Sequence, residues 1–157
     1  MSARVERLQE RFPNAAVGVA ADGIPHLAVS PEDVPAVVQA LRDDLGYVRF
    51  VDLTAVDDPE REDRFELNYL LYSMDERCWV RVKTRTSGEA PSIAAVFPGA
   101  NWYEREVYDL FGVRFSGHPN LTRILMPDDW EGHPLRRDEP LGEVPVDFTV
   151  TRDVYGT

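Results

Sequence analysis

The stretch at residues 78–86 reads CWVRVKTRT, and its alternation decides the kind of fold that we expect. Aromatic and β-branched residues favour a strand, in which successive side chains point to opposite faces. One face then carries Val80 and Val82, and the other carries Trp79, Arg81, Lys83 and Arg85. An apolar face opposite a charged one is typical of a half-exposed strand in an antiparallel sheet. The charged face is explained equally well as ordinary solvated surface.

Further strands precede this one. Two stretches rich in the same residue types, separated by loops of charged and polar residues, predict strands at residues 47–56 and 64–72. Upstream, residues 15–20 and 24–29 predict a hairpin, because Asp22-Gly23 between them is a strong turn signal.

Helices are predicted around these strands. The spacing of Val5, Leu8 and Phe12 predicts a helix over residues 2–12. A second helix is expected to start at Ser30-Pro31, with serine as its cap, and to end at Gly46.

Two helical segments are predicted after the last strand. Residues 92–97 suggest a short helical piece. The run from Asn101 to Gly112 predicts a full helix, which begins with a capping box in which Asn101 accepts from first-turn amides and Glu104 reaches back.

The chain changes character after residue 115. Five of the twelve prolines lie in residues 116–157, which lack helical periodicity. We therefore expect one folded α/β domain over residues 1–115 and an extended proline-rich segment over residues 116–157 that packs on a partner. No stretch approaches the roughly 20 apolar residues of a membrane span, and the N-terminus does not resemble a secretory signal.

Composition excludes several function classes. A net charge of −11 argues against nucleic acid and against adhesion to an anionic membrane surface. Cys78 is the single cysteine, so the chain forms no internal disulfide and supplies too few thiolates for an iron–sulfur cluster. This favours the cytoplasm. Phosphate-loop, dinucleotide-binding and nucleophile-elbow motifs are missing.

A metal site is the enzymatic alternative, and its possible ligands are His118, Asp128, Asp129, Glu131 and His133. A stand-alone metal-dependent hydrolase would use them. Each histidine, however, lies in a Gly-His-Pro triplet outside any helix. Such a triplet favours a turn in which the ring donates a hydrogen bond that fixes the chain.

The charges on the predicted third helix also have two interpretations. Arg105 and Asp109 are spaced for a salt bridge on the helix surface. Alternatively, Glu104, Arg105 and Asp109 meet a partner or anchor the following segment in a desolvated setting, where losing one partner costs on the order of 3–5 kcal/mol. We favour the second interpretation for these three residues and a solvated position for Glu106.

Three blocks in this order and spacing resemble the 30 kDa (C) subunit family of respiratory complex I. They read NWYEREVYDLFGV at residues 101–113, GHPNLTRIL at residues 117–125 and WEGHPLRRDEPL at residues 130–141. Two departures are visible. Thr122 stands where the family commonly carries a basic residue, and the chain ends soon after Phe148, whereas many relatives continue in a longer charged tail. We therefore expect one charge contact fewer and less coverage of the neighbouring subunit.

The resemblance implies an α/β (α+β) fold with a mainly antiparallel sheet flanked by helices and an extended C-terminal segment. It implies a cofactor-free structural subunit in the peripheral arm of a proton-translocating NADH:quinone oxidoreductase, on the cytoplasmic face of the membrane. FMN, iron–sulfur clusters and quinone are expected in neighbouring subunits, and the 49 kDa (D) subunit is the expected partner. The residues expected at that interface or in its motifs are Glu104, Arg105, Asp109, Gly112, His118, Arg123, Trp130, His133, Leu135, Arg136 and Arg137.

Two other assemblies remain open. The chain could serve as the corresponding subunit of a hydrogenase- or ferredoxin-linked complex, because other subunits choose the electron donor. A free adaptor domain unrelated to respiration is the third possibility.

Overall fold

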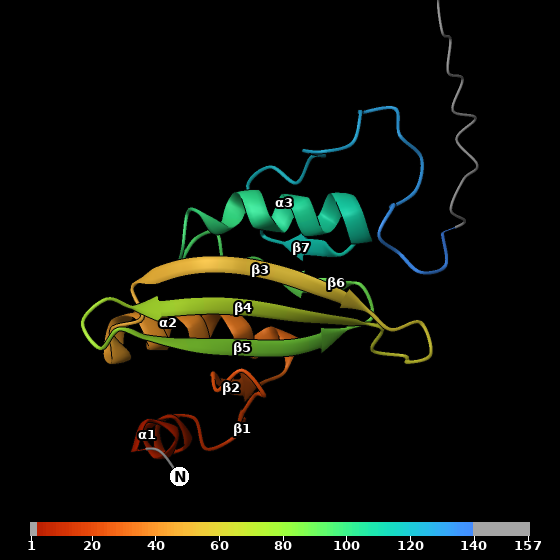
Figure 1. The fold of residues 1–157 in the computed structure, drawn as a ribbon. Coiled ribbons are helices and arrows are strands. Elements are labelled where there is room, and N and C mark those ends of the chain that lie inside the picture. Colours follow the sequence, from red (N-terminus) through yellow and green to blue (C-terminus); the bar gives the residue numbers. More distant parts are fainter. Residues whose placement is uncertain (1–2, 140–157) are drawn as a thin grey trace, which may run out of the picture.

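The computed structural model describes residues 3–139, with side chains from Val5 onward, and shows a mixed α/β fold. Its main sheet has five strands in the order β1-β2-β5-β4-β3 (Figure 1). The strands are β1 (Ala16–Val19), β2 (Pro25–Ala28), β3 (Arg49–Asp57), β4 (Phe65–Ser73) and β5 (Cys78–Thr86). Neighbouring strands are antiparallel except β2 and β5, which are parallel. The predicted mainly antiparallel sheet is therefore confirmed.

One face of the sheet forms the core. Alternate residues of β4 are buried, and Val80 and Val82 of β5 are buried beside them. The helix α2 (Val34–Leu45) adds Val38 and Leu41 to the same cluster and lies behind β4 and β5 in Figure 1. Trp79 is 39% exposed on the opposite face, as the alternation along β5 predicts.

The N-terminal elements agree with the periodicity of the sequence. The helix α1 (Ala3–Arg11) buries Val5 and Leu8, and Phe12 is buried directly after it. The Asp22-Gly23 turn joins β1 to β2, with Gly23 at φ +80°.

Two local predictions are wrong. Ser30 makes no side-chain cap; residues 31–33 form a 3-10 helix, η1 (Pro31–Asp33), and the Ser30 hydroxyl donates to Asp33 Oδ2 at 2.8 Å. Residues 92–97 form a turn, closed by the Val96 and Phe97 amides on the Ile93 carbonyl, because Pro98-Gly99 interrupts any helical run.

The helix α3 (Ala100–Phe111) lies along β3 and is framed by a small second sheet. In that sheet β6 (Glu89–Pro91) pairs in parallel with β7 (Arg114–Ser116), which the sequence pattern did not predict. Because β6 precedes the helix and β7 follows it, the pairing brings both ends of the α3 region together.

The chain after β7 runs back over α3 without forming a helix or strand as far as residue 139. Residues 140–157 of the predicted extended segment lie outside the described residues. Its packing on a partner stays a prediction. Within residues 3–139, none of the helices has the length and apolar character needed to cross a membrane.

Candidate functional site

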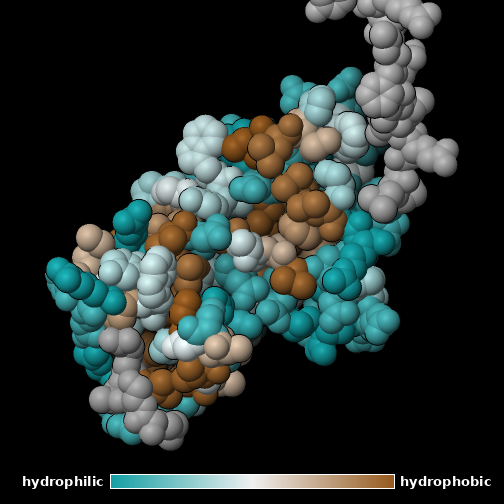
Figure 2. All heavy atoms as spheres, viewed as in Figure 1, coloured by the Kyte–Doolittle hydropathy of each residue, from teal (hydrophilic) through white to brown (hydrophobic). Residues whose placement is uncertain are grey.

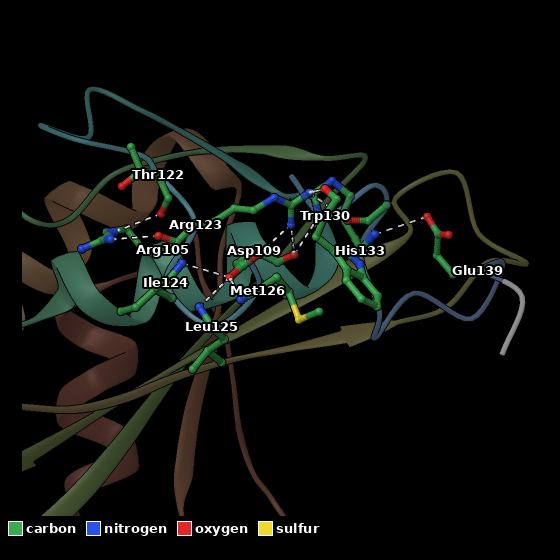
Figure 3. A network of polar contacts seen from close by, with 11 residues as sticks. Arg105, Asp109, Thr122, Arg123, Ile124, Leu125, Met126, Trp130, His133 and Glu139 are labelled. Atoms are coloured by element: carbon green, nitrogen blue, oxygen red, sulfur yellow. Dashed lines mark hydrogen bonds and ion pairs between the residues drawn. The ribbon is translucent and has the colours of Figure 1, made fainter. Parts of the chain in front are cut away.

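Asp109 is the centre of a network that joins α3 to the following chain (Figure 3). It lies in the last turn of the helix and is fully buried. Its Oδ2 accepts hydrogen bonds from the backbone amides of Ile124 at 2.9 Å, Leu125 at 2.7 Å and Met126 at 2.9 Å. One carboxylate oxygen therefore sets the path of three consecutive residues.

Arg123 completes this network. Its Nη1 donates to Asp109 Oδ1 at 2.6 Å, and its Nη2 donates to the carbonyls of Trp130 and Gly132, both at 3.0 Å. The Arg123 side chain thus links the helix to the loop that contains Trp130 and Gly132. In Figure 3 the guanidinium lies between Asp109 and the Trp130 backbone.

These contacts determine the charge of Asp109. Burial by itself would raise its pKa, but the amides of Met126, Ile124 and Leu125 and the Arg123 guanidinium outweigh burial and lower the pKa to about 2. The carboxylate is therefore ionised at neutral pH and accepts all four donors.

Arg105 holds the same segment from one helical turn earlier. Its guanidinium donates to the carbonyls of Thr122 and Arg123, each at 3.0 Å, and lies 5.1 Å from the centre of the Trp102 ring. The surface salt bridge to Asp109 considered from the sequence does not form. Asp109 and Arg105 each anchor the following segment instead, which is the interpretation that we favoured.

Gly112 and His133 meet at the end of α3. His133 Nδ1 donates to the Asp109 carbonyl at 2.9 Å, and Arg123 Nη1 donates to the same carbonyl at 3.3 Å, so both satisfy an acceptor at the helix end. Gly112 closes the helix at φ +78°, and a Cβ at Gly112 would lie 2.7 Å from His133 Cδ2. Glycine is therefore required at position 112 both because φ is positive and because a Cβ would clash with His133.

Glu104 and His118 are buried at the other end of α3. The Glu104 carboxylate accepts from the Ser92 hydroxyl at 2.6 Å and from the Ile93 amide at 2.7 Å, and His118 Nε2 lies 3.8 Å from it. Burial raises the pKa of Glu104 to about 7. The predicted capping box is wrong, since the N-cap is Gly99 and Glu104 points into the core.

The turn interpretation of the Gly-His-Pro triplets is confirmed. His118 Nε2 donates to the Asn101 carbonyl at 3.2 Å, and its Nδ1 accepts from the Asn120 amide at 3.0 Å. His133 bonds to Asp109, so the two rings are fixed eight residues apart along α3, about 12 Å at 1.5 Å per residue.

That separation prevents the two histidines from sharing a metal ion. Asp128, Asp129 and Glu131 are exposed on the loop that precedes His133. In the part of the chain that the structure describes, no three histidine, cysteine or acidic side chains come close enough to hold a metal. The metal-ligand set proposed from the sequence is therefore not assembled.

A second anchor, which sequence reasoning missed, holds the end of the segment. Arg64 Nη2 donates to Asp57 Oδ2 at 2.6 Å and its Nη1 to Asp138 Oδ2 at 2.6 Å, while the Arg137 amide donates to Asp57 at 2.7 Å. The Arg64 guanidinium lowers the pKa of Asp57. Asp57 is the last residue of β3 and begins an acidic run of sequence, and nothing in the local pattern distinguishes it from Asp58.

Arg136 and Arg137 have different roles around this anchor. Arg136 pairs with Asp138 at 2.8 Å and lies 5.9 Å from the Phe65 ring, whereas the Arg137 side chain is exposed and, among residues 3–139, Arg137 bonds through its amide. Leu135 is tied by its amide to the Leu110 carbonyl at 3.0 Å, which leaves its side chain outside.

Four large apolar side chains point outward from this network. They form what we call the α3 surface, whose exposed fractions are Trp102 60%, Leu125 60%, Trp130 44% and Leu135 52%. In Figure 2 hydrophobic residues reach the surface in the region of α3 and the chain that follows it, and also lower on the same face. Several polar groups of the segment bond inward, while these four apolar side chains face solvent.

The predicted site residues therefore fall into two groups. Trp130, Leu135 and the Arg137 side chain are available on the surface. The others hold the segment in place from inside and are not themselves free for contact; they are Glu104, Arg105, Asp109, Gly112, His118, Arg123, His133 and, through Asp138, Arg136.

Comparison with known families gives an extended match. A family model described as the 30 kDa subunit of respiratory-chain NADH dehydrogenase matches residues 27–145. The protein named as the C subunit of NADH-quinone oxidoreductase in Roseiflexus sp. (strain RS-1) is 44% identical, and the match covers 95% of this chain and 89% of that protein. The protein of the same name in Methylobacterium sp. (strain 4-46) is 43% identical, with 99% and 76% covered.

Two solved structures share the fold. A chain of the membrane-bound sulfane sulfur reductase, an archaeal respiratory membrane complex, has a TM-score of 0.77 at 27% identity and covers 88% of this chain and 84% of that one. The trypsin-resistant fragment (1-134) of Nqo5 has a TM-score of 0.66 at 26% identity and covers 75% and 99%.

Proposed function

Since this chain belongs to the respiratory-chain NADH dehydrogenase 30 kDa subunit family, we propose that it is a cofactor-free structural subunit of a proton-translocating NADH:quinone oxidoreductase. It docks on the 49 kDa (D) subunit in the peripheral arm, on the cytoplasmic face of the membrane. The single observation that carries this proposal is the α3 surface, four large apolar side chains exposed over a segment that the chain itself holds in shape.

Exposed apolar groups of this size favour a protein partner. Tryptophan is enriched among the residues that dominate binding energy, and a buried core of aromatic and aliphatic groups surrounded by polar groups is typical of interfaces. Trp130 is expected to contribute most, with Leu135 and Leu125 beside it. Arg137, whose side chain is exposed next to Leu135, is suited to pair with a carboxylate on the rim.

The internal anchors reduce the cost of binding. A segment without helix or strand normally loses conformational entropy when it is ordered on a partner. Here Asp109, Arg123 and Arg64 already bond the segment to the domain before any partner arrives. The apolar side chains are therefore presented in a set arrangement, and little further ordering is required.

The role that follows is positional. Electron-transfer rates depend on the distance between redox groups, so a rigid subunit that fixes its neighbours contributes to the reaction from NADH to quinone without reacting itself. The flavin, clusters and quinone site are assigned to the neighbouring subunits. This chain's own contribution is the placement of the α3 surface.

A related complex is the second candidate. The archaeal sulfane sulfur reductase chain has the same fold, so the fold by itself does not select the electron acceptor. Identity of 44% to a subunit of an NADH-quinone oxidoreductase, against 27% to the sulfane sulfur reductase chain, favours the first candidate.

The test is assembly in cells that express a tagged copy of the chain. The double variant Trp130→Ala with Leu135→Ala, both exposed on the α3 surface, is expected to reduce recovery of the 49 kDa subunit and NADH:quinone reductase activity at least tenfold, as loss of a dominant interface residue does. Trp79→Ala, on the opposite face of the sheet at 39% exposure, serves as the matched control and should leave both unchanged. Full assembly and activity in the double variant would contradict the docking proposal.

A further inference from the structure

A groove with a volume of about 720 Å³ lies between α2 and the end of β5, far from the α3 surface. Its floor and walls come from α2, from the chain between α1 and β1, and from β5; the apolar residues lining it include Phe12, Pro13, Val29, Ala36 and Val37. Figure 1 shows α3 beyond β3 and α1, β1 and β2 beyond β5, at opposite ends of the strand order. The groove is therefore separate from the proposed docking site.

The pairing of β2 with β5 ends at Lys83, where β5 borders this groove, and η1 is the next element of the chain that comes near β5. β2 pairs only with Arg81–Lys83, and the last backbone bond between the two segments runs from the Val29 amide to the Lys83 carbonyl. Alternate residues of a strand direct their amide and carbonyl to the same side. The backbone amide of Arg85 therefore points to the same side of the strand as the Lys83 carbonyl. Within the described residues this amide has no backbone partner.

Two side-chain groups at the groove also lack partners within the part of the chain that the structure describes. Thr84, which is 3% exposed, has no hydrogen bond to its buried Oγ1, and Arg85 has none to its buried Nη1. Both residues line the groove. Buried hydroxyl and guanidinium groups are normally bonded, so each of these two is a polar atom at the groove that lacks an acceptor.

The charges near Arg85 define what kind of acceptor fits. Glu66 serves two cations, accepting from Lys83 at 3.2 Å and from Arg85 Nη2 at 2.9 Å. Nη1 of Arg85 has Asp58 only at 3.9 Å, which is too long for a hydrogen bond. Asp33, across the groove, is occupied by the Ser30 hydroxyl. Glu66 therefore accepts from one nitrogen of the Arg85 guanidinium, and a second carboxylate beside Arg85 would add to its hydrogen bonds.

We propose that this groove takes an extended polypeptide segment of a neighbouring subunit, which adds a short strand to the free edge of β5. The segment's carbonyl accepts from the Arg85 amide, and an acidic side chain meets the exposed part of the Arg85 side chain. An apolar side chain fills the space between Phe12 and Val37. Strand addition at a groove between a helix and a sheet edge is an established mode of peptide recognition.

Hydrogen exchange at single-residue resolution gives the first test, in the isolated chain and in the purified complex. In the isolated chain the Arg85 amide should exchange at least tenfold faster than the amides of Thr84 and Thr86, which face β4. In the complex the Arg85 amide should slow at least tenfold. Equal exchange rates of the Arg85 amide in both samples would overturn the proposal, whatever the fate of the α3 surface.

Photo-cross-linking of the purified complex identifies the occupant. With p-benzoylphenylalanine in place of Ala36, which lines the groove, we expect a cross-link to one segment of another subunit that contains aspartate or glutamate. Gln39, exposed on the same helix but outside the groove, is the matched position and should not give this product. A cross-link to a second copy of this chain or to residues 140–157, or a protected Arg85 amide without any cross-linked polypeptide, would overturn the proposal.

Charge exchange then tests the acidic contact. Arg85→Glu should lower the yield of the Ala36 cross-link at least fivefold, and replacing the segment's acidic residue by lysine should restore it. Arg81→Glu, on the same strand and face but outside the groove, is the control and should leave the yield unchanged. An Arg85→Glu variant that cross-links as the parent does would contradict the carboxylate contact.

Discussion

The carboxylate of Asp109 and the guanidinium of Arg123 form an ion pair at 2.6 Å in which the Asp109 side chain is wholly inaccessible to solvent. The pair joins the last turn of α3 to a segment that has no secondary structure of its own. Because three backbone amides share the same carboxylate, the contact organises the chain as well as neutralising a charge. The α3 surface depends on this pair for its shape.

Asp109→Asn is expected to destabilise the chain by about 3 kcal/mol, since the amide nitrogen would face Arg123 and leave it unpaired in a buried setting. The amides of Ile124, Leu125 and Met126 should exchange faster with solvent. Urea unfolding and hydrogen exchange measure both effects. Glu106→Gln, the same kind of change at an exposed position of the same helix, should cost less than about 0.5 kcal/mol. Equal effects of the two changes would contradict the role given to Asp109.

The contribution of Asp109 also depends on pH. Its folded pKa of about 2 lies below the ordinary value of 3.8. The stabilisation is therefore fully present above pH 3.8 and is lost as the pH falls through about 2. The difference in unfolding free energy between the parent and Asp109→Asn should accordingly shrink from pH 5 to pH 2. A constant difference over that range would show that the carboxylate charge is not what holds the segment.

Gly112→Ala tests the close approach of His133. Gly112 and Gly117 have almost the same backbone angle, φ +78° and +77°, but a Cβ at Gly117 meets nothing within 4 Å. Gly117→Ala should therefore cost about 1 kcal/mol from backbone strain alone, and Gly112→Ala about 1–3 kcal/mol more from displacement of the His133 ring. Thermal unfolding of both variants gives the comparison. His133→Ala should remove the additional cost in the double variant, and failure to do so would place the clash elsewhere.

Arg64→Gln should separate the end of the segment from the β3–β4 hairpin. Arg64 is largely buried and its partner Asp57 almost wholly so, whereas Arg61 and Asp63 on the same hairpin are exposed. We expect a cost of about 3 kcal/mol for Arg64→Gln and little or no cost for Arg61→Gln, because solvent screens the exposed pair. Faster exchange of the Arg137 amide should accompany the first change only. An unchanged Arg137 amide in Arg64→Gln would show that Asp57 holds the segment without Arg64.

Glu104→Gln should flatten the dependence of stability on pH. Burial raises the pKa of Glu104 from 4.5 to about 7, so its favourable contribution is full below pH 4.5 and is lost as the pH rises through about 7. At about 1.36 kcal/mol per pKa unit, the rise from 4.5 to about 7 amounts to about 3 kcal/mol. Glutamine keeps an acceptor for Ile93 and does not ionise, so the variant should unfold with a nearly constant free energy from pH 5 to pH 8. Glu106→Gln should retain the slope of the parent.

Local patterns predicted the strands of the main sheet and most helices correctly because these depend on periodicity. The alternation along β5 placed Trp79 outside and Val80 inside. Gly46 and Gly112 end their helices as expected, and both are in the left-handed conformation. The prediction of a capping box was wrong although Asn101 and Glu104 have the right spacing for one. The Glu104 carboxylate accepts instead from the Ser92 hydroxyl and the Ile93 amide. A motif that spans four residues carries no information on a partner eleven residues away.

For the site, the sequence predicted which residues take part but not their contacts. The sequence identified the residue types along α3 and the following chain, including Arg105, Asp109 and Arg123, but not which of them meet. Arg123 reaches Asp109 fourteen residues away, and Arg137 reaches Asp57 across eighty residues. The pairing of β6 with β7 and the groove at the edge of β5 likewise depend on contacts between distant segments.

By itself, then, the sequence determined the alternation and periodicity that produce a half-exposed antiparallel sheet with helices on its core face, and the family to which the chain belongs. Only the tertiary structure decided that the charges of α3 turn inward to hold the next segment and that its apolar side chains turn outward. The physical reason is that a backbone without helix or strand must find hydrogen-bond partners elsewhere. Those partners are chosen by proximity in the folded chain, which local sequence does not encode.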